Sequence, residues 1–198
     1  RRLAAHFGLA YLDTGLLYRA VARKLLAAGA DADDASAATT IARDLVAADL
    51  EQPGLRAPEV SDAASKVAAI EGVRAALLDF QRDFARQPPG GAAGAILDGR
   101  DIGTVVCPDA TLKLFLTAAP EVRARRRHTE LLGEGAGSIY ARVLAEVRGR
   151  DERDSQRGIA PLVPADDAVE LDTTGLDADA VFAKALALIR LRLSADGG

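Results

Sequence analysis

Four short apolar runs, each flanked by polar or glycine-containing turns and by helical patterns, constrain the fold of this chain more than any other feature. The runs are found at residues 9–12, 95–98, 111–116 and 168–172. Between them apolar residues recur at helical spacing, as in the stretch 16–26. Short strands that alternate with helices form parallel βαβ units with right-handed crossovers. The sequence therefore predicts an α/β fold with parallel strands and flanking helices.

The helical patterns account for most of the remaining residues. We expect helices over 1–6, 16–26, from Asp31 or Asp33 to about 50, around Ser65, over 74–86, from 119 through Arg127, from a cap at Ser138 onward, and over 177–193. Proline and glycine interrupt these patterns at 52–58 and 87–91, which are expected to be loops.

Composition excludes several classes of protein. The 198 residues are 49% hydrophobic and 27% charged, which is typical of a soluble globular protein, and we find neither a membrane-spanning stretch nor a signal peptide. A net charge of −4 argues against binding to a nucleic-acid polymer. The single Cys107 fits a reducing cytoplasm and is expected to be a small buried residue. With no hydroxyl or carboxylate pattern near them, His6 and His128 are expected to be structural.

A cluster of charged residues follows the apolar run at 95–97. Asp98, Arg100 and Asp101 lie there among glycines. At the carboxyl edge of a parallel sheet, where open α/β folds bind ligands, Arg100 could bind a phosphate while Asp98 holds a hydrated cation. The alternative is a strand that ends in an Asp-Gly turn with a surface Arg100–Asp101 pair. The local sequence leaves both interpretations open.

A second charged segment carries Arg150, Arg153, Asp154 and Arg157, which share one face if the segment is helical. A charge run of this kind is most often a solvated helix face joined by pairs such as Arg150 with Asp154. Three arginines against one acid nevertheless leave the face positive. Such a face suits a polyphosphate whose charge must be neutralised during transfer.

Thr14 lies where the first apolar run gives way to a helix, and Arg19 follows about one turn later. A hydroxyl at a helix start can bind a phosphate oxygen, since the helix amino terminus attracts anions. The alternative role for Thr14 is an ordinary N-cap. Ser65 and Arg74 have no local signature, and on local grounds they are assigned to the surface.

Taken in order, these segments resemble the bacterial cytidylate kinase family. The resemblance rests on residues 12–19, 63–68, 73–74, 98–106 and 150–162, and so covers nearly the whole chain. It implies the three-layer fold of a P-loop nucleoside monophosphate kinase, with a parallel sheet flanked by helices. By this resemblance residues 1–30 and 92–198 form the core, with a lid at about 128–158. Residues 31–91 form a monophosphate-binding insert, shortened near 48–58.

The same resemblance implies an activity and a set of site residues. A monomer would transfer the γ-phosphoryl group of ATP to CMP or dCMP, giving CDP or dCDP, with Mg²⁺ that Asp98 reaches through water. The residues that match substrate-binding positions are Thr14, Arg19, Ser65, Arg74, Arg100, Asp101, Arg150 and Asp154. Those that match catalytic positions are Arg100, Arg150, Arg153 and Arg157.

The phosphate-binding loop that P-loop kinases use is not found in these 198 residues. That loop needs Gly-x-x-x-x-Gly-Lys-Ser/Thr, and none of the four lysines follows a glycine. In the family the loop belongs just before the helix that residues 1–7 finish, so we expect the protein to have residues ahead of Arg1. Two alternatives stay open: a P-loop kinase for another small phosphate acceptor, and a non-catalytic nucleotide-binding module.

Overall fold

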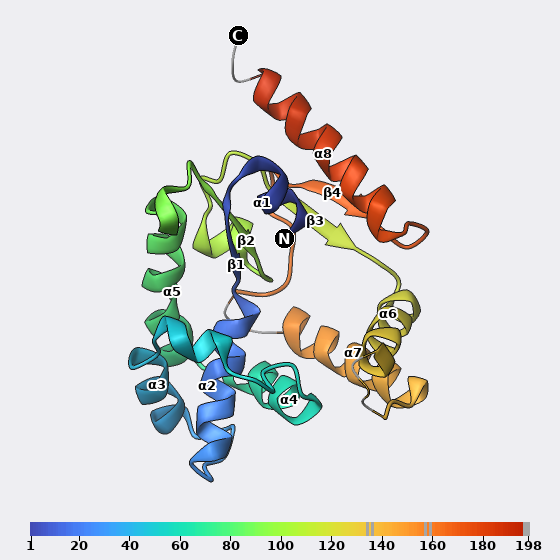
Figure 1. Ribbon diagram of the computed structural model, residues 1–198. Helices are drawn as coiled ribbons and strands as arrows, with labels where there is room; N and C mark the ends of the chain where they lie inside the picture. Colours follow the sequence, from blue (N-terminus) through green and yellow to red (C-terminus); the bar gives the residue numbers. More distant parts are fainter. Residues whose placement is uncertain (134, 136, 157, 159, 196–198) are drawn as a thin grey trace. The chain divides into compact units, whose positions relative to one another are not determined.

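The computed structural model describes residues 1–133, 135, 137–156, 158 and 160–195. The chain divides into two compact units, Arg1–Cys107 with Arg157–Pro161, and Pro108–Gln156 with Leu162–Gly198. Each unit contains a pair of parallel strands with its own helices (Figure 1). The predicted α/β class with parallel strands is therefore confirmed.

In the first unit, strand β1 (Ala10–Asp13) pairs in parallel with β2 (Ala95–Asp98), and Asp13 lies opposite Asp98. Both strands thus end in a carboxylate at the same edge. Helix α1 (Arg2–Phe7) precedes β1, and α2 (Gly15–Ala27) follows it directly (Figure 1). The crossover to β2 continues through α3 (Ala35–Arg43), the 3₁₀ helix η1 (Ala47–Glu51), α4 (Pro58–Val67), α5 (Glu71–Arg86) and η2 (Pro89–Gly91).

The core of this unit forms where α2 packs against α3, α4 and α5. Leu17, Val21 and Leu25 recur at helical spacing on α2 and are almost completely buried. They contact apolar residues of the neighbouring helices, among them Val67 of α4 and Leu77 of α5. The apolar periodicity of residues 16–26 thus predicted the helix, although Leu16 is only half-buried and Leu26 is exposed.

The helix expected from Asp31 or Asp33 to about residue 50 is shorter than predicted. Asp34 caps it, with a side-chain oxygen that accepts from the Ala37 amide at 2.9 Å, so α3 begins at Ala35. It ends at Arg43, and a separate 3₁₀ helix follows. There the Asp49 carboxylate accepts from the Val46 amide at 3.0 Å and from Lys24 Nζ at 2.6 Å. These hydrogen bonds hold the pKa of Asp49 below its usual range.

In the second unit, β3 (Leu114–Thr117) pairs in parallel with β4 (Val169–Asp172). Between them α6 (Pro120–Gly133) and α7 (Tyr140–Gln156) pack together as a hairpin, and α8 (Ala178–Ala195) follows β4 (Figure 1). Ala124, Leu131 and Val143 form a small apolar cluster in the hairpin. None of the helices in the described ranges is both long and apolar enough to cross a membrane.

Ion pairs supplement the small apolar contact between α6 and α7. Both terminal nitrogens of Arg123 donate to the Asp151 carboxylate, at 2.7 and 2.6 Å, and Arg148 pairs with Glu121 at 2.6 Å. Because planar bidentate pairs fix geometry as well as distance, Arg123 sets how α7 lies against α6.

Two expectations about single residues, Cys107 and His128, need correction. Cys107 is half-buried, not buried. The Ser138 hydroxyl lies 2.8 Å from His128 Nδ1, so this histidine does have a hydroxyl neighbour. The local sequence could not indicate this contact, because the two residues are ten positions apart.

Candidate active site

The carboxyl ends of β1 and β2 are joined by Thr14, which is 3% exposed. Its backbone amide and its hydroxyl both donate to the Asp98 carbonyl, at 2.9 and 2.8 Å. Thr14 occupies the N-cap position of α2, but its side chain makes no capping hydrogen bond. The N-cap interpretation is therefore right about position and wrong about the hydroxyl, which ties the two strand ends together.

Gly99 fits closely over this junction. A Cβ atom at position 99 would lie against the Thr14 hydroxyl and 2.8 Å from Ile102 Cδ1, at the start of the π-helical turn η3 (Ile102–Val106). Neither neighbour belongs to a long flexible side chain. The glycine is thus required by the close approach of Thr14.

Replacing Gly99 with alanine is expected to lower the free energy of unfolding by about 1–3 kcal/mol, because the added methyl group overpacks the junction and displaces the Thr14 hydroxyl. Gly175→Ala is the matched control, since a Cβ there meets no atom within 4 Å. Urea unfolding of both variants checks the prediction. Equal stability of the two variants would contradict it.

A buried ion pair lies next to this junction. Arg74 of α5 donates to the Asp101 carboxylate, and the two residues are 9% and 6% exposed. Arg74 Nη1 also donates to the Ala68 carbonyl at 3.2 Å, and its guanidinium lies 5.8 Å from the centre of the Tyr18 ring. Of the two interpretations left open by the sequence, the surface Arg100–Asp101 pair is therefore wrong, because Asp101 is buried and binds Arg74, 27 residues away.

Ser65 is also buried, at 5% exposure, so the assignment of Ser65 and Arg74 to the surface is wrong. Ser65 lies on α4, which ends at Val67, one residue before the Ala68 carbonyl that Arg74 binds. Helices α4 and α5 thus each carry a buried polar side chain, and the two residues share no motif in the sequence. Buried polar side chains of this kind are typical of a ligand site or of a structural network.

Arg19 connects α2 to the segment that leads into α4. Its Nη1 donates to the Leu55 carbonyl at 3.0 Å and to the Ser61 hydroxyl at 2.5 Å. Arg56, in the same segment, donates to Asp13 Oδ2 at 2.8 Å. The proline- and glycine-containing loop at 52–58 is thus anchored to α2 by Arg19 and to the carboxyl end of β1 by Arg56.

The two strand-end carboxylates have different partners. Asp13 binds Arg56, while Asp98, which is exposed, accepts from the Tyr11 hydroxyl at 3.2 Å. Partial burial, followed by the nearby Asp98 and Asp13 charges, raises the pKa of Tyr11 to about 12, so the phenol stays protonated at neutral pH. Arg100 follows in the turn after β2 and is half-buried.

No group of three or more His, Cys, Asp or Glu side chains that could enclose a metal ion occurs within the described residues. The carboxylates that end β1 and β2 at this edge are Asp13 and Asp98, and carboxylate oxygens of this kind bind hydrated divalent cations.

Arg150, Arg153 and Asp154 of the second charged segment lie on α7, in the second unit. Arg150 Nε is 3.8 Å from Asp154 Oδ2, which confirms the i,i+4 pair that the spacing predicted. Asp154 is 3% exposed, whereas Arg153 is exposed. Arg157 lies outside the described residues.

Sequence reasoning missed Tyr11 and Arg56 as members of this site, and it grouped Asp13 with Thr14 without giving the carboxylate a role. A signal existed for Asp13, because both strands end in Leu-Asp, at 12–13 and at 97–98. Tyr11 precedes Asp13 by two residues and so lies on the same face of the strand. Arg56 is 43 residues from its partner and has no local signature.

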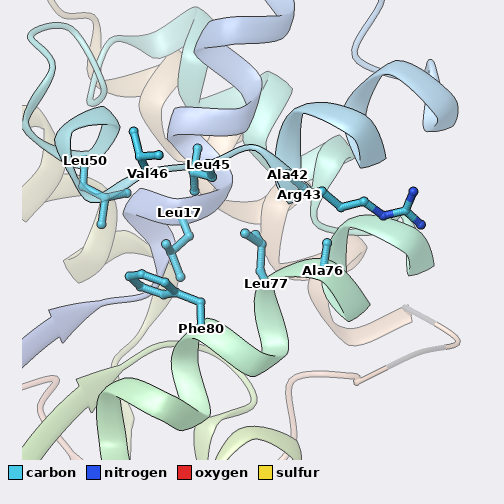
Figure 2. A pocket seen from close by; sticks show the side chains of 9 residues that line it. All are labelled: Leu17, Ala42, Arg43, Leu45, Val46, Leu50, Ala76, Leu77 and Phe80. Atoms are coloured by element: carbon cyan, nitrogen blue, oxygen red, sulfur yellow. The ribbon is translucent and has the colours of Figure 1, made fainter. Parts of the chain in front are cut away.

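An apolar cavity of about 170 Å³ lies elsewhere in the first unit (Figure 2). Leu17, Leu77 and Phe80 point toward its interior, while the Arg43 side chain points away from them (Figure 2). Because no polar groups converge there, the cavity does not suit a phosphate ester. The strand edge is therefore the better candidate for the site.

Comparison with known proteins bears on this site. The family model described as cytidylate kinase matches residues 1–191. The cytidylate kinase of Paramagnetospirillum magneticum is 61% identical over 189 residues, which cover 96% of this chain and 89% of that protein. Those of Methylocella silvestris and Xanthobacter autotrophicus are 58% and 59% identical, over 96% and 97% of this chain and 86% and 90% of theirs.

Proposed function

Since the chain belongs to the cytidylate kinase family, we propose that it transfers the γ-phosphoryl group of ATP to CMP or dCMP, giving CDP or dCDP. The observation that carries this proposal is the identity of 58–61% with three cytidylate kinases over at least 96% of the chain. The buried polar residues near the carboxyl ends of β1 and β2 support it, because a nucleoside monophosphate needs charged and hydroxyl side chains to bind it.

We assign acceptor binding to eight residues. Three buried side chains supply hydrogen-bonding groups suited to a polar base: Arg74, Asp101 and Ser65. In a confined site, hydrogen bonds from the base would satisfy these groups better than water can. Thr14, Arg19 and Arg100 lie at or near the strand edge and suit the acceptor phosphate and sugar. From the second unit we assign Arg150 and Asp154 to the acceptor nucleoside.

The proposed reaction needs no catalytic base. The attacking group is an oxygen of the acceptor phosphate, which is already ionised at neutral pH. The protein then has to align this oxygen with the γ-phosphorus and to neutralise the charge of the transferring group. We assign the second task to Arg100, Arg150, Arg153 and Arg157.

Kinases that use ATP require a divalent metal, and we propose that here it is Mg²⁺. The oxygen donors at the strand edge fit this hard cation: Asp98 is exposed, and the neighbouring Asp13 adds negative charge. Asp98 would hold the hydrated ion. When bound, Mg²⁺ neutralises phosphate oxygens and orients the donor.

The finer organisation is also proposed. We propose that residues 1–30 and 92–198 form the core, 31–91 the insert and about 128–158 the lid. The α6–α7 hairpin supports the lid assignment, because it covers most of that range. A monomer in the cytoplasm fits the single cysteine and the small nucleotide substrates.

Thermal-shift titration of the full-length protein separates this function from its two alternatives. We expect CMP to raise the unfolding midpoint more than AMP, GMP or UMP does, since only ligands of the native state stabilise it. Stabilisation by a different monophosphate would indicate another P-loop kinase. Stabilisation by CMP without any CDP formation would indicate a non-catalytic binding module.

A further inference from the structure

Tyr11 and Asp98 are diagonal neighbours on one face of the β1–β2 pair. In the parallel register Tyr11 lies opposite Ile96, and Asp98 follows Ile96 by two residues on the same face. At this diagonal spacing a tyrosine can reach across the strands, and its hydroxyl donates to Asp98 Oδ2 at 3.2 Å. The contact is therefore a product of strand register.

The carboxylates at the ends of β1 and β2 have hydrogen-bond partners of different charge. Asp13 is bound by the cationic Arg56, which offsets its charge. Tyr11 is the side chain that donates to the Asp98 carboxylate within the described part of the chain, and this donor is neutral. A neutral donor restricts the orientation of a carboxylate without cancelling its charge. Asp98 is thus oriented and still able to attract a cation.

Carboxylates that bind metals are commonly held by a hydrogen bond to one oxygen, and loss of such a partner weakens metal binding. We propose that Tyr11 is a positioning residue that holds the Asp98 carboxylate in the orientation in which it binds the hydrated divalent cation. This inference rests on the proposed function, because it takes Asp98 as the residue that reaches the metal.

The test compares Tyr11→Phe, Asp98→Asn and the double variant of the full-length protein. Tyr11→Phe removes only the hydroxyl. Mn²⁺ serves as the probe, and its binding in the presence of ATP is measured by water-proton relaxation. Tyr140→Phe is the matched control, since it removes a tyrosine hydroxyl whose acceptor is the Glu121 carbonyl of the α6–α7 hairpin.

We expect Tyr11→Phe to weaken Mn²⁺ binding about tenfold, with CMP affinity and the unfolding midpoint nearly unchanged. In the Asp98→Asn background the same substitution should have no further effect, because Tyr11 acts through Asp98. Wild-type Mn²⁺ affinity in Tyr11→Phe, or an equal loss in both backgrounds, overturns the inference. Failure of the proposed function is recognised separately, as an unsubstituted protein that forms no CDP from CMP and ATP.

Discussion

Replacing Asp101 with alanine is expected to lower the free energy of unfolding by about 3–5 kcal/mol and the affinity for CMP by at least about tenfold. The reason is burial: Arg74 is 9% exposed, so loss of its carboxylate partner leaves an uncompensated charge inside the first unit. The affinity falls because the acceptor base would lose a buried hydrogen-bond partner. Chemical denaturation without nucleotide and calorimetric titration with CMP measure the two effects.

A double variant separates stability from binding in this prediction. Arg74→Met combined with Asp101→Leu removes both charges and fills a similar volume, so most of the lost stability should return. CMP binding should stay weak, because neither polar group is restored. If the double variant binds CMP as the unsubstituted protein does, the assignment of this pair to the acceptor site is wrong.

The second large effect concerns rate and not stability. Arg153→Met is expected to lower kcat at least about a hundredfold, because an arginine that neutralises the transferring phosphoryl group contributes several orders of magnitude in rate. Arg153 is exposed on α7, so the substitution should leave the unfolding midpoint nearly unchanged. Steady-state kinetics with saturating CMP and ATP provide the measurement.

Arg142→Met is the control for this effect, since Arg142 is exposed on the same helix and outside the charged segment. It removes the same charge from the hairpin and should leave kcat within about twofold of the unsubstituted value. Equal kcat in the two variants would mean that Arg153 has no specific role in neutralising the transferring phosphoryl group.

The strands β1 and β2 and the helix α2 could be predicted because their sequence signals are local. Residues 9–12 and 95–98 are short apolar runs followed by turns, and each corresponds to a strand within one residue. The periodicity of residues 16–26 predicted α2, but not which of its residues are buried. The apolar run at 95–97 also predicted that Asp98 lies at a strand end, and the i,i+4 spacing predicted the Arg150–Asp154 pair.

The rest of the site depends on contacts between distant residues, which no local pattern records. Arg74 and Asp101 are 27 residues apart, and nothing near Arg74 distinguishes it from other helical arginines before the fold buries it. Arg56 and Asp13 are 43 residues apart. Only the resemblance to a family pointed to Ser65 and Arg74, and burial is what now supports that assignment.

The central claim is the transfer of a phosphoryl group from ATP to CMP or dCMP, and product identification tests it most directly. The full-length protein is incubated with ATP, Mg²⁺ and one monophosphate at a time, and the products are followed by phosphorus NMR. We expect rapid formation of ADP with CDP or dCDP, and much slower reaction of AMP, GMP and UMP. Rapid turnover of another monophosphate with no CDP or dCDP formed would contradict it.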